Sequence, residues 1–320
     1  DGAYTEADYT LNHQGNRSAW TNRGCDVEVA DILSGNALKF TQGCDLFPRT
    51  ALFHEFVERP NGNWDIAPIE RTSNLWYLVS DQKKPSCAGL AAVNLDRNYI
   101  FDAFISKHLS PFYMTTPAKV LIPGKKVDGQ WKAISATDRA LMNASTSYVF
   151  NQIEEDGNTP ATLETYLEDT INIYGKLEKQ NFTTKDWLVL SSASGSNPCA
   201  AYISLETFDR SRLVIDQTLY WHLADSEEEA IYIVGLLNSN AMSDAIKDFQ
   251  PEGGFGKRHI HTLPYKIIPE FDCEDAAHTQ VVAKTQELMH EWAVLCCDGE
   301  YANLLRPNSS SLNSRRRRQQ

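Results

Sequence analysis

The residues from 253 to 264 bring together the side chains that could contact a nucleic acid most closely. Three glycines, one aromatic ring, two cations and two imidazoles gather in this run, as Gly253, Gly254, Phe255, Gly256, Lys257, Arg258, His259 and His261. Glycine lets backbone amides approach a phosphate, lysine and arginine neutralise its charge, and arginine can read guanine in the major groove. The run therefore predicts a loop that approaches DNA. The alternative is a surface loop that only joins a helix to a strand.

A second candidate is the segment from Ser196 to Cys199. Enzymes that methylate adenine in DNA usually hold the flipped base with an Asn-Pro-Pro-Tyr motif, in which the aromatic ring stacks on the base. Here Asn197-Pro198 has no second proline, and Cys199 stands where the ring belongs. Ser-Gly-Ser-Asn-Pro is turn chemistry in every position. We therefore predict a turn between two strands and no catalytic residue.

Metal and cofactor chemistry has little support in the sequence. His259 and His261 would face the same side of an extended strand, with Asp272 and Cys273 downstream, so a metal site is one interpretation, but we predict none. A methyl-donor loop needs a glycine-rich turn that opens a helix, whereas the 253–261 run leads into a proline-punctuated extended segment. The seven cysteines form no CxxC pair and are typical of reduced cytosolic thiols. No hydrolase or nucleotide-phosphate motif occurs.

Composition limits how the chain could meet DNA. The 320 residues carry a formal net charge of -12, which argues against binding through bulk positive charge, so any DNA contact must be local. The sequence starts at Asp1 without an initiator Met, which favours an excerpt from a longer polypeptide. It has no signal pattern and no long apolar stretch, and we place it in the cytoplasm without membrane contact. Residues 301–320, which contain four consecutive arginines, are expected to form a disordered basic tail.

The elements that must position these residues fall into two predicted units. Residues 1–155 are strand-rich, with strands expected at 51–58, 74–80 and 118–124 and a single helix at 95–109. Residues 156–300 form an α+β unit that contains the glycine-rich loop. It begins with a helix capped by Thr159, whose inward residues are Leu163, Tyr166, Leu167 and Ile171.

Buried strands and two further helices complete the second unit. Strands are expected at 186–194, 200–205 and 212–223. Ser226 with Glu229 forms a capping-box pattern that predicts a helix over 227–239. A last, long helix presents a packing stripe, Val281, Thr285, Leu288, Trp292 and Leu295, which could pack inside the chain or pair two chains as a homodimer. The expected fold class is α+β: a mixed strand-rich first unit, then a helix-covered mixed sheet and a long C-terminal helix.

Several phrases, in order, resemble one family of proteins. They are GCDLFPRTALFHEF, NIYGKLEKQ, VLSSASGSNPCAAYI, VIDQTLYWHL, EEEAIYIVGLLNSNAMSDAI and GGFGKRHIHTLPYKIIPEFD. Their most specific parts are Leu-Asn-Ser at 237–239 and the run from Gly254 to Pro264. Together they resemble the C-terminal, target-recognition region of large N6-adenine-specific DNA methyltransferases, including fused restriction-modification enzymes and phage-defence methylases.

The resemblance implies a function, partners and site residues. It implies a non-catalytic segment that clamps double-stranded DNA, while the catalytic domain of the same polypeptide, outside this chain, holds S-adenosylmethionine. It carries DNA contact onto Gly254, Phe255, Gly256, Lys257, Arg258, His259 and His261, and also onto Pro48 and Arg49. The alternative is a protein-protein interaction or scaffold module of the same defence system, in which the 281–295 stripe and the acidic surface bind another subunit.

Overall fold

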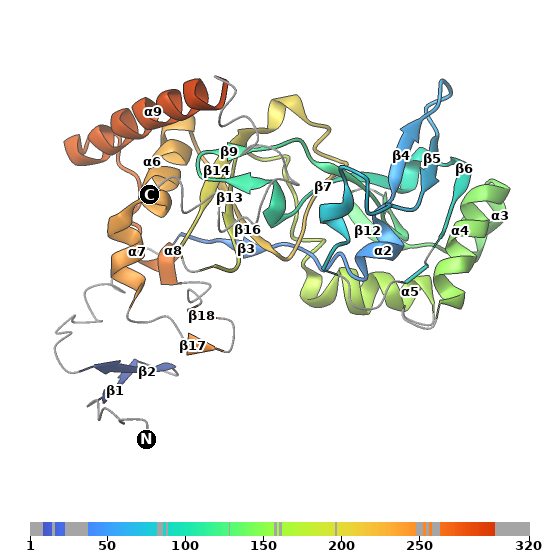
Figure 1. Ribbon diagram of the computed structural model, residues 1–320, viewed down its shortest axis with the longest axis horizontal. Coiled ribbons are helices and arrows are strands. Elements are labelled where there is room, and N and C mark those ends of the chain that lie inside the picture. Colours follow the sequence, from blue (N-terminus) through green and yellow to red (C-terminus); the bar gives the residue numbers. More distant parts are fainter. Residues whose placement is uncertain are drawn as a thin grey trace.

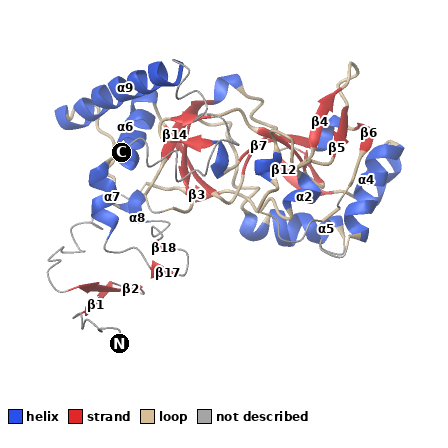
Figure 2. Cartoon of the chain, in the orientation of Figure 1, coloured by secondary structure: helices blue, strands red, loops and turns tan. Residues whose placement is uncertain are grey.

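The protein is an α+β molecule with strands in the middle and helices toward both ends (Figures 1 and 2). The computed structural model describes residues 9–14, 17–22, 38–81, 86–87, 89–127, 129–156, 159, 162–195, 197–247, 252–253, 256–257 and 263–297. The predicted tail at 301–320 lies outside these residues.

A four-stranded sheet lies in the part of the chain that precedes the glycine-rich run. Its strand order is β14-β13-β16-β3, and all neighbours are antiparallel. The strands are β3 (Thr41–Gln42), β13 (Trp187–Ser192), β14 (Ala200–Ser204) and β16 (Leu219–Ala224). Strand β13 is central and almost wholly buried. Both faces of this sheet are therefore covered, and the apolar runs at 186–194 and 200–205 are confirmed as buried strands.

Helices cover one face of that sheet. They are α6 (Glu227–Asn238), α7 (Asn240–Lys247), α8 (Leu263–Lys266) and α9 (Ala276–Cys297). The Ser226 hydroxyl accepts a hydrogen bond from the Glu229 amide, at 3.1 Å, which confirms the predicted start of α6. Val189 and Ala200 pack toward α6, whereas Leu188 and Leu190 point into a separate cluster on the other face. This alternation is the two-residue period of a strand.

The rest of the molecule contains two three-stranded sheets and several hairpins. The sheets are β4 (Glu55–Glu58), β5 (Trp64–Ala67) and β6 (Ala92–Leu95), and β10 (Ala118–Leu121), β7 (Ile100–Phe104) and β15 (Leu213–Ile215). The paired short strands are β1 (Tyr9–Gln14) with β2 (Arg17–Asn22), β8 (Leu109–Ser110) with β9 (Tyr113–Met114), β11 (Gly124–Val127) with β12 (Gln130–Ala133), and β17 (Glu252–Gly253) with β18 (Gly256–Lys257). Strand β7 runs parallel to β15 and antiparallel to β10.

Short helices and turns enclose these strands. They are α2 (Arg49–Leu52), α3 (Ala136–Leu141), α4 (Ala144–Glu155), α5 (Leu163–Thr165), the π-helical turn η4 (Tyr166–Ile171), and the 3₁₀ turns η1 (Trp76–Leu78), η2 (Arg97–Tyr99), η3 (Ser106–His108), η5 (Ile173–Gly175) and η6 (Leu205–Thr207). Leu163, Tyr166, Leu167 and Ile171 are all buried, as predicted. They join the same cluster as residues of β7 and β10. The division at 155/156 stays a prediction.

Several predictions of local structure were wrong. The strand expected at 51–58 is a strand only from Glu55, because its first residues belong to the helix α2. The strand expected at 212–223 is divided into β15 and β16, which belong to different sheets. The described part of residues 1–155 contains the helices α2, α3 and α4 in place of the single helix expected there.

The helix expected at 95–109 is the strand β7 between the turns η2 and η3. Because β7 is paired on both sides, its apolar run is continuous and imitates the face of a buried helix. The strand expected at 74–80 contains the 3₁₀ turn η1 instead. Thr162, not Thr159, caps the helix that follows, through its hydroxyl and the Thr165 amide at 3.1 Å.

Helix α9 packs within the chain. It lies against α6, where Val282 and Thr285 are buried, while Leu288 is 42% and Val294 is 47% exposed. The first half of the 281–295 stripe therefore packs inside the chain, as one of the two alternatives predicted. Pairing of two chains through this helix stays a prediction. Within the described part of the chain, no helix is long and apolar enough to cross a membrane.

Candidate functional site

The predicted DNA-contacting run lies between α7 and α8. Strands β17 and β18 pair antiparallel, Glu252 with Lys257 and Gly253 with Gly256. This pairing places the backbone of Lys257 in a short hairpin at one end of the molecule (Figure 1). The other predicted contact residues of the run, Gly254, Phe255, Arg258, His259 and His261, lie outside the described residues.

Asn238 joins helix α6 to strand β14, ahead of this hairpin in the sequence. Its side-chain oxygen accepts a hydrogen bond from the Ala200 amide at 3.0 Å, and its side-chain nitrogen donates to the Ala200 carbonyl at 2.8 Å. The two bonds join the last residue of α6 to the first residue of β14. The Ala200 N–H gains a partner in this way, and its carbonyl accepts a second hydrogen bond beside the one from the Phe112 amide at 2.9 Å. This double contact explains why asparagine stands in the Leu-Asn-Ser motif.

Ser239 turns the chain from α6 into α7. Its hydroxyl accepts a hydrogen bond from the Met242 amide at 3.1 Å, as an N-cap does, and donates to the Leu236 carbonyl at 2.7 Å. Met242 and Ile246 of α7 are then buried in the same cluster as α6. The chain therefore leaves the core at a fixed point before it reaches the hairpin.

Helix α8 anchors the chain again after the hairpin. Tyr265 is buried and stacks on Phe40, with ring centroids 4.0 Å apart and an interplanar angle of 11°. Burial raises the pKa of the Tyr265 phenol. Ile268 is buried beside it. Both ends of the 248–262 segment are consequently held by packed side chains, which is how a rigid scaffold presents a binding loop.

Pro48 and Arg49, the other predicted contact residues, make interior contacts. Pro48 is buried and precedes α2, and the Arg49 side chain is only 13% exposed. The Arg49 guanidinium donates to a carboxylate oxygen of Asp216 at 3.2 Å, and Asp216 is itself buried. DNA contact by these two residues stays a prediction, while the structure gives Arg49 a defined role as partner of a buried charge.

The segment from Ser196 to Cys199 joins β13 and β14, as the prediction of a turn requires. Pro198 and Cys199 are buried, and the Cys199 carbonyl accepts a hydrogen bond from the Ser192 amide at 2.9 Å. Cys199 belongs to the cluster on the far side of the sheet from α6. Because its side chain is fully enclosed there, it is placed to pack and not to stack on a base.

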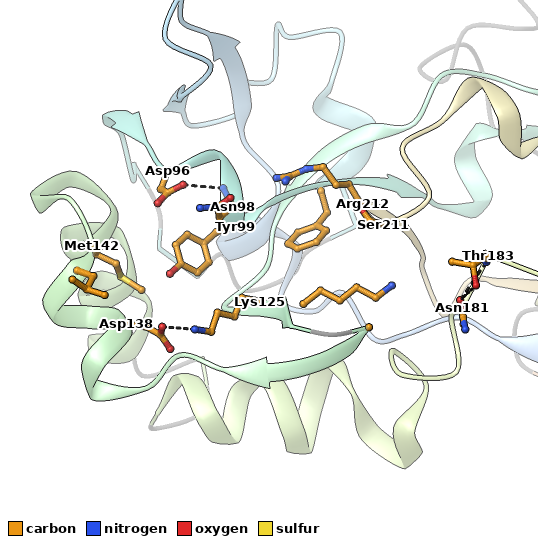
Figure 3. A pocket seen from close by; sticks show the side chains of 14 residues that line it. Asp96, Asn98, Tyr99, Lys125, Asp138, Met142, Asn181, Thr183, Ser211 and Arg212 are labelled. Carbon is orange, nitrogen blue, oxygen red and sulfur yellow. Dashed lines mark hydrogen bonds and ion pairs between the residues drawn. The ribbon is translucent and has the colours of Figure 1, made fainter.

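The structure also contains a pocket that the sequence did not indicate. Its volume is about 650 Å³, and it lies between the hairpin β11–β12, the turn η2 and the loop before β15 (Figure 3). Four polar side chains line it: Asn98, Asn181, Thr183 and Ser211. Three cations and two carboxylates also line it: Lys125, Lys126, Arg212, Asp96 and Asp138. These residues come from five separate stretches of sequence, so no local pattern predicts the pocket.

Two of the charged groups in the pocket neutralise each other. Lys125 donates to the Asp138 carboxylate, and Asp138 also accepts bonds from the amide and hydroxyl of Ser135. The Lys125 hydrogen bond, followed by those from Ser135, lowers the pKa of Asp138 to about 2. Asp138 therefore remains ionised and paired.

The remaining cations are partly desolvated. Burial lowers the pKa of Lys126, an effect that the Asp209 carboxylate opposes. Burial and the neighbouring Arg97 charge lower the pKa of Arg212. A cation with a lowered pKa gains stability when an anion arrives. Elsewhere in the described part of the chain, no group of three or more His, Cys, Asp or Glu residues is placed to hold a metal ion.

Comparisons with known proteins find similarity among solved structures. No protein-family model matches the sequence, and no curated protein matches it. The fold is similar to the Type IIL restriction-modification enzyme MmeI, solved in complex with DNA, with a TM-score of 0.45 and 10% identity over 98% of this chain and 38% of that chain. It is also similar to the Type IIG restriction endonuclease BpuSI, with a TM-score of 0.35 and 13% identity over 97% and 30% of the two chains.

The chain spans well under half the length of either of these proteins.

Proposed function

We propose that this chain is the DNA target-recognition region of an adenine-specific DNA methyltransferase of a restriction-modification or phage-defence system. It holds double-stranded DNA through the 253–261 run. A catalytic domain outside this chain binds S-adenosylmethionine and methylates the flipped adenine. The segment itself is then a binding module without a catalytic residue.

The anchored hairpin is the observation that carries this proposal. The run combines glycines with Lys257 and Arg258, and the chain on either side of it is anchored in the core by Ile246 and by Tyr265. Fixed ends limit the conformations that a loop must give up on binding, so the loop loses less entropy when it meets a rigid duplex. Base-reading side chains need that restriction, because discrimination depends on hydrogen-bond geometry.

A local contact also fits the charge of the chain. With a net charge of -12, most of the surface repels a polyanion. A hairpin that carries adjacent cations concentrates the attraction in one place, and glycine amides add donors to phosphate oxygens. The duplex would thus be held at this hairpin and at the catalytic domain.

The test is selection of DNA by the whole 320-residue chain. The chain is incubated with a pool of short duplexes of random sequence at low and moderate salt, and the retained DNA is sequenced. Enrichment of one short motif is expected. Substituting Lys257→Ala and Arg258→Ala together should weaken binding and reduce the salt slope by about 1 for each phosphate contact that is lost. The fold should remain intact, because exposed loop charges contribute little stability.

A matched control neutralises two exposed lysines elsewhere, Lys132 on β12 and Lys284 on α9. It makes the same change in net charge and should leave duplex binding unaltered. Equal loss in both variants would mean that only overall charge matters, and would remove the hairpin from the site.

The second candidate is an interaction module that binds another subunit of the same system. The partly exposed Leu288 on α9 favours it, because this residue continues the apolar stripe beyond the contact with α6. This candidate predicts no retention of duplex at either salt concentration. It also predicts that polar substitution of Leu288 abolishes assembly with the partner, while the target-recognition proposal predicts no effect of that substitution on duplex binding.

A further inference from the structure

The pocket beside the hairpin β11–β12 is lined by the cations Lys125, Lys126 and Arg212. Of these three cations, only Lys125 forms an ion pair with a carboxylate among the described residues. Figure 3 shows Lys125 directed to Asp138 on one side of the pocket, with Asn181 and Thr183 on the other side. Removing this neutralised pair leaves Lys126 and Arg212 as the positive groups and Asp96 as the negative one. The balance of the pocket lining is thus positive, in a chain that is acidic overall.

Lys126 is half-buried on strand β11. Within the part of the chain that the structure describes, no carboxylate lies within ion-pair distance of its ammonium. The nearest charge that stabilises it is the exposed Asp209, which also stabilises Arg212. Burial of the Lys126 ammonium therefore costs hydration free energy that no fixed carboxylate offsets.

Arg212 is held in place by the backbone. Its Nη2 group donates to the carbonyl oxygens of Arg97 and Ile100, and its guanidinium carbon lies 5.4 Å from the centre of the Phe101 ring. These contacts use the donors of one nitrogen, and a guanidinium has five N–H groups in a fixed fork. The rest of the fork is pre-oriented to receive an oxyanion.

A neutral donor stands at the same pocket. The Asn181 side-chain oxygen accepts hydrogen bonds from the amide and hydroxyl of Thr183, which leaves its NH₂ group as a donor. Ser211 also lines the pocket, but its amide and hydroxyl both donate to the Asp209 carboxylate. Two cations and a neutral amide donor suit a phosphate, because a phosphate presents several acceptor oxygens and up to two negative charges.

We propose that this pocket binds the phosphate group of a nucleotide between Lys126 and Arg212. The volume of about 650 Å³ exceeds what a bare ion needs and falls among small-ligand sites, which span roughly 300–1,000 Å³. The phosphate belongs to a free nucleoside monophosphate or to the backbone of bound DNA. The residues that line this site are not those of the hairpin β17–β18, and the proposal does not rest on recognition of DNA by the 253–261 run.

The test titrates the full chain with deoxyadenosine 5′-monophosphate by calorimetry at low salt, with deoxyadenosine as the phosphate-free control. The variant is Lys126→Met. Its matched control is Lys132→Met on the paired strand β12, an exposed lysine that does not line the pocket. We expect Lys126→Met to weaken nucleotide binding about tenfold or more, since one charge-assisted hydrogen bond is lost. Lys132→Met and the thermal unfolding profile should not change.

A second arm measures a short duplex with the same variants and identifies the source of the phosphate. If Lys126→Met weakens duplex binding as well, the pocket holds a backbone phosphate. If only the nucleotide is affected, the ligand is a free nucleotide. Lys126→Arg keeps the charge and should restore most of whichever binding is lost.

Two outcomes would overturn the proposal. One is that neither the nucleotide nor the duplex depends on Lys126. The other is that Lys126→Met and Lys132→Met weaken binding equally, which would reduce the effect to net charge. Loss of duplex binding in the Lys257→Ala/Arg258→Ala variant with unchanged nucleotide binding would separate this pocket from the hairpin.

Discussion

Helices α6 and α9 approach each other so closely at Gly235 that the geometry predicts the effect of a substitution there. Gly235 lies on α6, and a Cβ atom added to it would stand 2.0 Å from the Thr285 Oγ1 atom, 3.1 Å from its Cβ and 3.2 Å from its Cγ2. Thr285 is 3% exposed and so has no free space into which to retreat. Gly235→Ala must therefore separate the two helices or force Thr285 out of its rotamer.

The net cost follows from two opposing terms. Overpacking of a filled core costs about 1–3 kcal/mol. Replacing glycine with alanine inside a helix returns about 1 kcal/mol, because alanine is the better helix former. Because the added Cβ would stand only 2.0 Å from the Thr285 Oγ1 atom, the overpacking cost lies in the upper half of its range, at about 2–3 kcal/mol. We therefore expect Gly235→Ala to destabilise the protein by about 1–2 kcal/mol, although the same change in an uncrowded helix would stabilise it.

A second substitution tests the cause. Thr285→Ala removes the Oγ1 and Cγ2 atoms and alone should cost about 1 kcal/mol for the lost packing. In the double variant the worst clash is gone and the helix-forming gain of alanine remains. The double variant should therefore be more stable than the sum of the single effects by at least about 1 kcal/mol.

The assay is equilibrium urea unfolding of the four proteins, with the midpoint and slope compared. A Gly235→Ala variant as stable as the parent, or strictly additive effects, would refute this close approach of α9 to α6. The helix would then be available to pair two chains instead.

Two further predictions concern buried charge. Arg49→Ala leaves the Asp216 carboxylate without its guanidinium, and the free energy of unfolding should fall by about 3–5 kcal/mol in urea titration, whereas Arg49→Ala combined with Asp216→Asn should recover part of the loss. If DNA contact were the only role of Arg49, stability would not change. Burial lowers the pKa of His54 from 6.5 to about 4, so the unfolded chain binds a proton first and stability falls as the pH drops from about 6.5 to 4. Urea unfolding at neutral and mildly acidic pH should show that loss, of about 1.4 kcal/mol per pH unit at most, and His54→Gln should remove this contribution; an unaltered pH dependence would contradict it.

The sequence by itself determined the elements whose signals are local. Ser226 and Glu229 located the start of α6, because a cap is formed within one turn of chain. Apolar runs located β13 and β14, and turn residues located the link between them. The α+β class followed from these elements. The glycine-rich run was also visible in the sequence, since its residue types are adjacent.

The tertiary structure decided what depends on neighbours distant in sequence. An apolar run around Phe101 suits a buried helix or a central strand equally, and pairing with β10 and β15 selects the strand. Arg49 resembles a surface cation until Asp216, far along the chain, accepts its hydrogen bond. Lys126 and Arg212 line the same pocket only because the fold brings the hairpin β11–β12 and the loop before β15 together. Charge and burial act through space, so a group's partner and its pKa are fixed only when the fold brings the distant residues together.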